Sequence, residues 1–383
     1  MEFEDWIVLR APPGTKVVDG HMMASGDAGP PSVELHSIPV SAIADLERDP
    51  TTLAAAPNMP TLLIEPRASG SAPGAIAWGI AAVGAEACAH DGTGVTVAVL
   101  DTGIDITHPS FAGVDVVQAD FTRTGLGDGN GHGTHCAGTI FGRDAGAGRI
   151  GVAPGITRAL IGKVLDQAGH GSTLMASRGL EWAADKGAHI ASLSLGLDVP
   201  GLVQKLIAKG WSEKLAAARG LDLFRRNIRL LDKQMAFLNE RPEHGLGMLV
   251  IAASGNESDR SSNPDFRIPA SLPAAAEGVI AVGALGQSKA GLTIADFSNT
   301  LPTVCGPGVA IRSAWPGRGY RELDGTSMAC PHVAGIAALW WQALGQLANA
   351  QTVKAKVMST ANLTDLAPGY DHTDVGMGIV RAP

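Results

Sequence analysis

The chain has 383 residues, of which 45% are hydrophobic and only 17% are charged, so it is long enough to bury a sizeable core. Its net charge of −8 and its 4% aromatic content argue against nucleic-acid binding, because no basic cluster alternates with stacking aromatic residues. No apolar run reaches the length of about 18 residues that spans a bilayer, so we expect neither a nucleic-acid nor a membrane partner.

The first 66 residues differ in character from the rest of the chain. Apolar runs predict strands at 6–9 and 32–38 and a short helix at 41–49. Residues 67–77 contain the sequence RASGSAP, which has the composition of a flexible linker. We therefore predict a small N-terminal α/β domain over residues 1–66, a linker over 67–77 and one large domain over 78–383.

The N-terminal sequence MEFEDWIVLR does not have the pattern of an export signal. It carries Glu2, Glu4 and Asp5 where a secretory signal has basic residues followed by an apolar segment. This favours a cytoplasmic protein, although a secreted chain that had lost its signal and restarted at Met1 would look the same.

The four cysteines are too few and too scattered for a disulfide framework or a paired metal site, so we expect free thiols. They are Cys88, Cys136, Cys305 and Cys330. Cys136 and Cys330 are expected to be small apolar core residues.

The segment VAVLDTGID is the first along the chain that contains a candidate catalytic residue. Its β-branched run at 95–100 predicts a buried parallel strand, which would deliver Asp101 at its carboxyl end. Ligand sites of open α/β sheets lie at that end of the strands. An isolated Asp-Thr-Gly is usually a simple turn, so the assignment depends on the motifs that follow.

The segment GNGHGTHCAGT surrounds His132 with glycines. Glycine allows close backbone approach and suits a helix that begins at the imidazole, which makes His132 the candidate general base. His135, one helical turn later, is a rival. We interpret it as a buried packing residue whose ring forms local hydrogen bonds.

Residues 191–196, ASLSLG, predict a strand with a free edge that could pair with an extended peptide. An insertion over about 197–247 follows, and its pattern predicts a long amphipathic helix or a helical hairpin. Apolar residues at helical spacing are Leu215, Leu221, Phe224, Ile228, Leu231, Met235 and Leu238, and the basic face has Arg225, Arg226, Arg229 and Lys233. We expect this helix to pack on the sheet with its basic face solvated; alternatively, it restricts access, binds a partner or shapes substrate choice.

Two further segments place polar side chains beside buried elements. The apolar run 248–253 predicts a strand, and the turn after it would project the amide of Asn256. In DGTSMACPHVAG, Ser327 opens an apolar run that predicts a helix. Unpaired N–H groups at a helix N-terminus favour an oxyanion, although a plain serine N-cap has the same geometry.

Asp101, His132 and Ser327 together could supply the anion, the base and the nucleophile of a serine protease. Their order along the chain is that of subtilisin. The three segments, with GNES at Asn256 and the closing DVGMGIVRA, resemble the subtilisin-like serine proteases from about Gly92 to the C-terminus. The cysteine after HGTH is similar to that of their proteinase K branch.

The resemblance implies an α/β fold with a doubly wound, mostly parallel sheet flanked by helices, and an endopeptidase that acts on proteins or peptides. It implies that Asn256 is the second oxyanion donor. The residues expected to bind substrate are Ser194, Leu195, Gly196, Ala253 and Gly255. The preferred substrate residue stays open, because the candidate pocket floor at 263–269 mixes acidic, basic and apolar side chains.

Residues 42–66 resemble the second half of the small propeptide domain that precedes many subtilisins, assists their folding and leaves its tail in the active-site cleft. We therefore expect the chain's own N-terminal segment to act as an intramolecular inhibitor, in a monomer. The linker at 67–77 is either cut by the enzyme itself or stays intact.

Many relatives bind structural calcium at positions where this chain has Ser110 and Ala145. Neither is a useful ligand for a hard cation, so we expect no calcium at that site and no required cofactor. Residues 128–130, which carry side-chain oxygens, are only a weak candidate for another calcium site.

Three other functions compete with a protease. A metal hydrolase could use His132 and His135 with Asp101, Asp105 or His108, but it lacks an adjacent glutamate base and leaves Asn256 and Ser327 without a role. A catalytically silent binding module is disfavoured because all four residues needed for chemistry are present. A peptide macrocyclase would keep the triad and transfer the acyl group to an amine.

Overall fold

The fold comes from a computed structural model, which describes residues 3–12, 15–18, 21–23, 30–68, 77–146, 148–240 and 246–383. Its strands are β1 (Phe3–Arg10), β2 (Lys16–Val18), β3 (His21–Met23), β4 (Ser32–Pro39), β5 (Thr52–Pro57), β6 (Pro60–Leu63), β7 (Arg67–Ala68), β8 (Thr96–Asp101), β9 (Asp115–Asp120), β10 (Arg158–Lys163), β11 (His170–Ser172), β12 (Ile190–Leu193), β13 (Leu195–Leu197), β14 (Leu249–Ala253), β15 (Ile280–Ser288), β16 (Gly291–Ile294), β17 (Val304–Pro307), β18 (Ile311–Trp315) and β19 (Gly319–Asp324). Its α-helices are α1 (Ile43–Arg48), α2 (Trp78–Ala82), α3 (His132–Phe141), α4 (Thr173–Asp185), α5 (Val199–Ala208), α6 (Glu213–Glu240), α7 (Thr326–Leu344), α8 (Ala350–Thr360) and α9 (His372–Val375).

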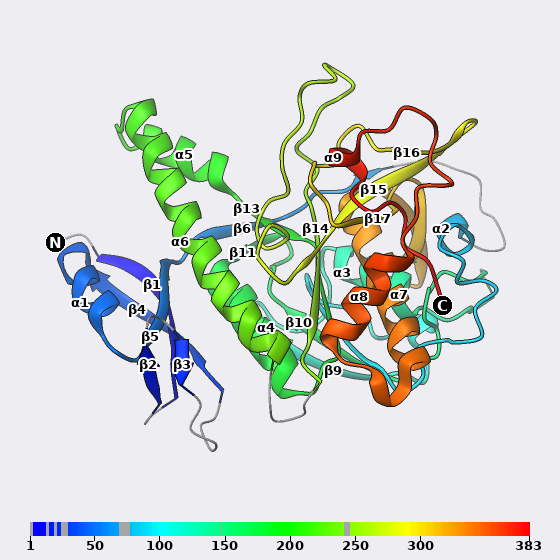
Figure 1. Ribbon diagram of the computed structural model, residues 1–383, viewed down its shortest axis with the longest axis horizontal. Helices are drawn as coiled ribbons and strands as arrows, with labels where there is room; N and C mark the ends of the chain where they lie inside the picture. The colour runs from blue at the N-terminus through cyan, green and yellow to red at the C-terminus, as the bar shows by residue number, and fades with distance from the viewer. Residues whose placement is uncertain are drawn as a thin grey trace.

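A mostly parallel sheet forms the centre of the molecule, as the sequence predicted (Figure 1). Within the described residues it has eight strands, in the order β16-β15-β14-β12-β8-β10-β9, with β17 paired to β15. All of its pairings are parallel except that of β15 with β16. Because parallel strands end at the same edge, the carboxyl ends of β8, β12 and β14 lie next to each other.

Both faces of this sheet are covered, which explains why its strands are continuous apolar runs rather than alternating ones. Val97 and Val99 of β8 face one core with helices α3 and α7, whereas Ala98 and Leu100 face a second core with α4 and α6. The alternation is the ordinary period of two in a strand. The sheet is therefore doubly wound, with β8 at its centre delivering Asp101 to the edge.

The N-terminal residues form a separate antiparallel sheet in the order β4-β1-β5, with α1 packed on it. We call residues 3–57 the N-terminal unit. Trp6 and Val8 of β1 pack with α1, while the alternate residues Ile7 and Leu9 pack in a cluster with residues of α4 and α6. One face of this sheet thus depends on the rest of the chain for its burial.

The predicted helical insertion is a hairpin of α5 and α6, and α6 lies between the N-terminal unit and the central sheet (Figure 1). The expectation of a solvated basic face is wrong for Arg226. Its guanidinium pairs with Glu47 and lies 5.2 Å from the centre of the Trp6 ring, both in the N-terminal unit. Helix α5 has no buried residue and projects beyond the sheet. Trp211, in the turn that follows α5, is 43% exposed.

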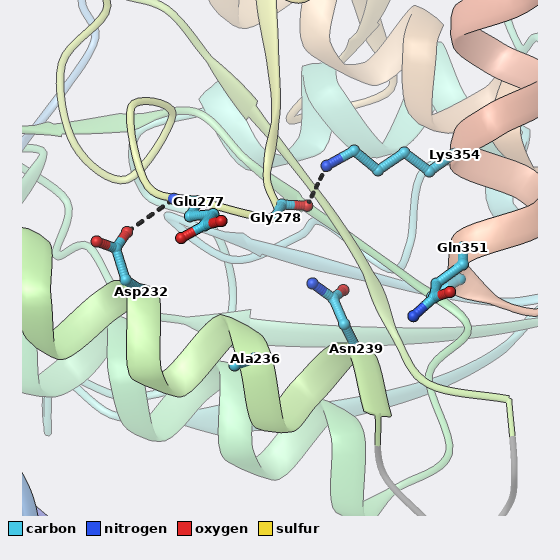
Figure 2. A pocket seen from close by; sticks show the side chains of 8 residues that line it. Asp232, Ala236, Asn239, Glu277, Gly278, Gln351 and Lys354 are labelled. Atoms are coloured by element: carbon cyan, nitrogen blue, oxygen red, sulfur yellow. Dashed lines mark hydrogen bonds between the residues drawn. The ribbon is translucent and has the colours of Figure 1, made fainter. Parts of the chain in front are cut away.

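Helix α6 is also bonded to the loop before β15. A cavity of about 340 Å³ lies where α6, the loop before β15 and helix α8 meet, and Asn239 is among its lining residues (Figure 2). Asp232 accepts a hydrogen bond from the Glu277 backbone N–H at 2.7 Å, and Lys354 Nζ donates to the Gly278 carbonyl at 3.0 Å. The loop before β15 therefore connects α6, through Asp232, to α8, through Lys354.

None of the helices in the described part of the chain has the length and apolar character needed to cross a membrane.

Candidate active site

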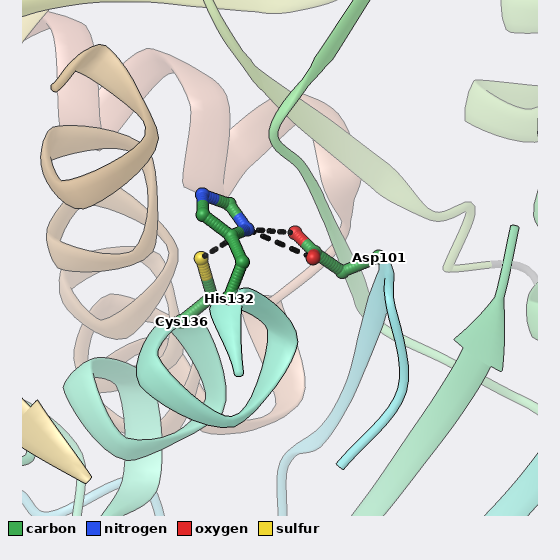
Figure 3. A group of neighbouring side chains, drawn as sticks. All are labelled: Asp101, His132 and Cys136. Atoms are coloured by element: carbon green, nitrogen blue, oxygen red, sulfur yellow. Dashed lines mark hydrogen bonds and ion pairs between the residues drawn. The ribbon is translucent and has the colours of Figure 1, made fainter. Parts of the chain in front are cut away.

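Asp101 and His132 form a buried pair at the carboxyl edge of the sheet. His132 Nδ1 donates to the two carboxylate oxygens of Asp101 at 2.8 and 3.0 Å (Figure 3). Both side chains are 1% exposed, and the Asp101 carboxylate also accepts the Thr102 backbone N–H at 2.7 Å. A carboxylate at Nδ1 keeps the neutral imidazole in the tautomer whose Nε2 accepts a proton.

The start of helix α3 is held by Asp128, which the sequence suggested only as a weak calcium ligand. His132 is the first residue of α3 and follows Gly131, whose φ of 100° favours glycine. The Asp128 carboxylate accepts the N–H groups of Gly131 and Thr134, each at 2.8 Å, and the Thr102 hydroxyl at 2.9 Å. Asp128 therefore joins the loop after Asp101 to the helix that carries the base.

The nucleophile candidate Ser327 is the second residue of α7, at the N-terminus of a buried helix. Its Oγ donates to the backbone carbonyl of Ile64 at 3.0 Å. His132 Nε2 is buried and has no hydrogen-bond partner among the described residues. The hydroxyl thus points at a peptide carbonyl of its own chain, and its bond to the base is open, as is common before substrate turnover.

Asn256 has its side-chain amide oriented by Thr326. The backbone N–H and the hydroxyl of Thr326 each donate to Asn256 Oδ1 at 2.9 Å. Because these groups are donors, the oxygen of the amide must face Thr326 and the NH₂ must face the other way. There Asn256 Nδ2 donates to the Glu65 carbonyl at 3.0 Å. The amide and the backbone N–H of Ser327 can both stabilise an oxyanion.

The predicted substrate strand at 191–196 is two strands, β12 and β13, which are separated at Ser194. The edge of β13 is occupied: the pairs are Leu195 with Leu63 and Gly196 with Leu62. The Ser194 carbonyl accepts the N–H of Ile64 at 3.4 Å.

Two other predicted substrate residues lie on the neighbouring strand end. Ala253 is the buried last residue of β14. Gly255 has a φ of 117°, and its N–H donates to the Thr326 hydroxyl at 3.2 Å. Gly255 therefore connects the turn before Asn256 to the start of α7, next to the nucleophile.

The N-terminal part of the chain passes through this site. Strand β6 is the middle strand of a three-stranded sheet, antiparallel to β11 on one side and β13 on the other. The chain that follows β6 passes Ser327 and then forms β7, which pairs with β19. We call residues 60–68 the cleft segment. The first residues of the predicted linker, 67–68, are therefore a strand, and residues 69–76 lie outside the described residues.

The ligand set of the metal-hydrolase hypothesis does not converge. His135 Nε2 donates to the Ile311 carbonyl at 3.0 Å, and His108 Nε2 donates to the Gly319 carbonyl at 2.9 Å. Asp105 accepts hydrogen bonds within its own loop and from the loop before β19. In the described ranges, the one cluster of ligand-type side chains within 4.8 Å of one another is Asp101, His132 and Cys136.

The cysteines are free, as predicted from their number and spacing. Cys136 Sγ lies 3.7 Å from His132 Nδ1 (Figure 3). Burial raises the pKa of the thiols of Cys136, Cys305 and Cys330 well above the usual value, so they stay protonated. They are core residues rather than nucleophiles.

Sequence reasoning missed three contributors to the site. Asp128 and Thr326 orient the candidate base and the candidate oxyanion donor. The available signal was that Asp128 directly precedes the GNGHGTH segment and that Thr326 lies inside DGTSMA. The place of Ile64 at the nucleophile had no local signal, because main-chain pairing of a strand leaves little trace in sequence.

Comparison with known proteins gives consistent results. The sequence profile described as "Subtilase family" matches residues 92–378. The chain is 37% identical over 314 residues to subtilisin Savinase of Lederbergia lenta, covering 80% of this chain and 97% of that protein. It is 36% identical over 315 residues to M-protease of Shouchella clausii strain KSM-K16, covering 80% of this chain and 69% of that protein. It is 34% identical over 355 residues to alkaline elastase YaB of Bacillus sp. strain YaB, covering 91% of this chain and 80% of that protein.

Proposed function

Since the chain belongs to the subtilase family and is a serine-type endopeptidase, we propose that it cleaves peptide bonds through Asp101, His132 and Ser327 by way of an acyl-enzyme. One observation carries this proposal: the buried Asp101–His132 pair and a Ser327 hydroxyl 3.0 Å from a peptide carbonyl oxygen lie at one edge of the sheet. Its substrates are proteins or peptides.

In this mechanism, His132 Nε2 takes the proton of Ser327 as Oγ attacks the substrate carbonyl. Asp101 stabilises the imidazolium that forms, and Asn256 Nδ2 with the Ser327 backbone N–H stabilises the oxyanion. The imidazolium then protonates the leaving amine. Water resolves the acyl-enzyme by the same steps in reverse.

We also propose that the cleft segment is an intramolecular inhibitor. It lies where an extended substrate would pair with β13, and its Ile64 and Glu65 carbonyls take the hydrogen bonds of Ser327 and Asn256. An external peptide must displace it or wait until it has been cut. The N-terminal unit holds the segment in place through its contacts with α6.

Fluorophosphonate labelling followed by intact mass spectrometry tests the catalytic proposal. The wild-type chain, nicked by trypsin and then diluted so that the N-terminal fragment dissociates, should gain one probe mass, with or without a chelator, and Ser327→Ala should gain none. The exposed Arg67 provides a trypsin site beside the cleft. An unlabelled wild-type chain after nicking, or an equally labelled Ser327→Ala chain, would contradict the proposal.

A further inference from the structure

We propose that the tip of the α5–α6 hairpin docks on the headgroup layer of an anionic phospholipid bilayer and so holds the active-site cleft near a membrane surface. This goes beyond the proposed function and does not depend on it. We call residues 205–215 the hairpin tip. Figure 1 shows the hairpin projecting past the central sheet.

The backbone of the hairpin tip is well ordered by hydrogen bonds. The chain leaves α5 through Gly210, whose φ of 92° favours glycine. The N–H groups of Gly210 and Trp211 donate to the carbonyls of Ile207 and Leu206 at 2.9 and 3.1 Å. This turn therefore holds Trp211 at the apex of the hairpin, where α5 gives way to α6.

The side chains lower in the hairpin already have partners within the protein. Ala216 is buried, and a Cβ on the buried Gly220 would lie 2.9 Å from Val203 Cγ2, so the two helices pack closely there. Arg219, one helical turn after Leu215, pairs with Glu4 of the N-terminal unit. Packing between the helices and docking of the N-terminal unit thus explain the body of the hairpin but not its tip.

Three large apolar side chains are exposed at the tip. Ile207 is 38% exposed and Leu215 59%, and Trp211 lies between them at the apex. Single exposed apolar residues are ordinary on a protein surface. Three within nine positions, at the end of a projecting element, indicate a contact surface.

The charges at the tip favour an anionic partner. Lys205, Lys209 and Lys214 are all exposed, and Glu213 is the one acidic residue among positions 205–215, so the tip has a net charge of +2 while the whole chain has −8. The first two lysines also suit the C-terminal end of α5. Lys214, however, is the second residue of α6, where the helix dipole disfavours a cation, so helix stability does not explain it.

The shape and chemistry of the tip fit a lipid surface better than a protein. Helix α5 has no buried residue, so the tip is a convex projection, around which a bilayer can deform. Tryptophan favours the boundary between headgroups and acyl chains, and lysines bind headgroup phosphates. The expectation of no membrane partner was based on the absence of a spanning segment, whereas contact at the bilayer surface needs only a few such side chains.

Docking at the tip has a consequence for the substrates that the enzyme meets. Asp198 alone separates α5 from β13, the strand that pairs with the cleft segment, and its carboxylate accepts the Gly201 N–H at 2.8 Å. The ten residues of α5 extend about 15 Å. A docked enzyme would therefore hold its cleft close to the bilayer and reach polypeptides exposed at that surface.

Co-sedimentation with phosphatidylcholine vesicles, with and without phosphatidylglycerol, tests the proposal on the full Ser327→Ala chain, which cannot digest itself. We expect binding to the vesicles that contain phosphatidylglycerol, and weaker binding at high salt. Lys209→Glu should weaken it at least about fivefold and Trp211→Ser about tenfold. Lys289→Glu and Leu347→Ser, which change exposed residues on other elements, are the matched controls and should bind like the parent chain. Circular dichroism of each variant checks that the helices are retained.

Three results would overturn the proposal. They are no binding to phosphatidylglycerol vesicles, equal weakening by the tip variants and their controls, and binding to polyglutamate without binding to vesicles. The last result would indicate an acidic protein partner instead of a bilayer. None of them would affect the catalytic proposal, which fluorophosphonate labelling tests separately.

Discussion

The N-terminal residues meet the rest of the chain in two regions that use different chemistry. In the cleft, β6 is held mainly by main-chain hydrogen bonds to β11 and β13, which any extended peptide could form. On α6, the N-terminal unit is held by particular side chains: Arg219 pairs with Glu4 at 2.6 Å, and the buried Asn227 donates to the Pro57 carbonyl at 3.1 Å. The cleft can therefore exchange its occupant, whereas the α6 surface is built for this one N-terminal unit.

The strongest way to separate the two regions is to remove the nucleophile. Ser327→Ala should lower peptidase activity at least about 10⁴-fold and leave the chain uncut, because no acyl-enzyme can form. Docking on α6 and pairing in the cleft should persist. Intact mass and hydrogen exchange of residues 3–68 measure both, and a Ser327→Ala chain that still processes would contradict the prediction.

Asn256→Ala tests the cleft alone. Loss of one oxyanion donor should lower kcat about 10²–10³-fold with little change in KM, a magnitude known from the corresponding donor of a subtilisin. Steady-state kinetics on the processed enzyme measure this split. A rise in KM with unchanged kcat would mean that Asn256 binds substrate without stabilising the transition state.

Asn227→Ala tests the α6 region alone. It leaves the Pro57 carbonyl without its buried donor, so the processed N-terminal unit should bind more weakly by about 1–3 kcal/mol, or roughly 5- to 150-fold. Inhibition of the processed enzyme by the N-terminal fragment added back, which contains both the N-terminal unit and β6, measures the change. Arg225→Ala is the matched control, because Arg225 pairs with Asp222 on its own helix. Equal weakening by both variants would show that α6 acts only through its general stability.

Acid should lower the free energy of unfolding of the catalytic domain, because two of its histidines are buried. Burial lowers the pKa of His135 to about 3 and that of His332 to about 4. The unfolded chain protonates them near pH 6.5, so between these values it binds more protons than the folded chain. Stability is therefore fully present above pH 6.5 and falls as the pH decreases, by about 1.4 kcal/mol per pH unit for each histidine.

Urea unfolding of Ser327→Ala at pH 7 and pH 5 measures this loss without self-digestion. Protonated His135 would bury an Nδ1–H that has no acceptor among the described residues. Adding His135→Gln to Ser327→Ala should reduce the slope by about 1.4 kcal/mol per pH unit, the contribution of one histidine, and an unchanged slope would contradict the assignment.

The positions of the proposed catalytic residues in the fold could be predicted from sequence because each lies at a boundary set by its own neighbours along the chain. The apolar run before Asp101 forms β8, and glycine turns precede His132 and Ser327 at the starts of α3 and α7. The periodicity that predicted a helical insertion was likewise local.

Contacts between distant parts of the chain could not be read in the same way. The partners of Arg219 and Arg226 are Glu4 and Glu47, which lie 215 and 179 positions away in sequence. The main-chain pairing of β6 has no side-chain pattern of its own, so its place in the site was expected only from the resemblance of residues 42–66 to a propeptide domain. Long-range docking, rather than local structure, limited the prediction.

Strand β6 is tethered to the catalytic domain by the chain that follows it and, through the N-terminal unit, by the contacts with α6, and this tether has a consequence for kinetics. A tethered strand faces the cleft at an effective concentration on the order of millimolar, so an uncut chain excludes substrates present at micromolar levels whatever the dilution. If the chain is cut between β6 and the catalytic domain, the same strand belongs to a separate molecule whose occupancy follows mass action. When the processed mixture is diluted, the cut N-terminal fragment should dissociate, so peptidase activity should rise after a lag that becomes shorter at greater dilution. The uncut chain cannot show this behaviour, because its inhibitory strand stays attached.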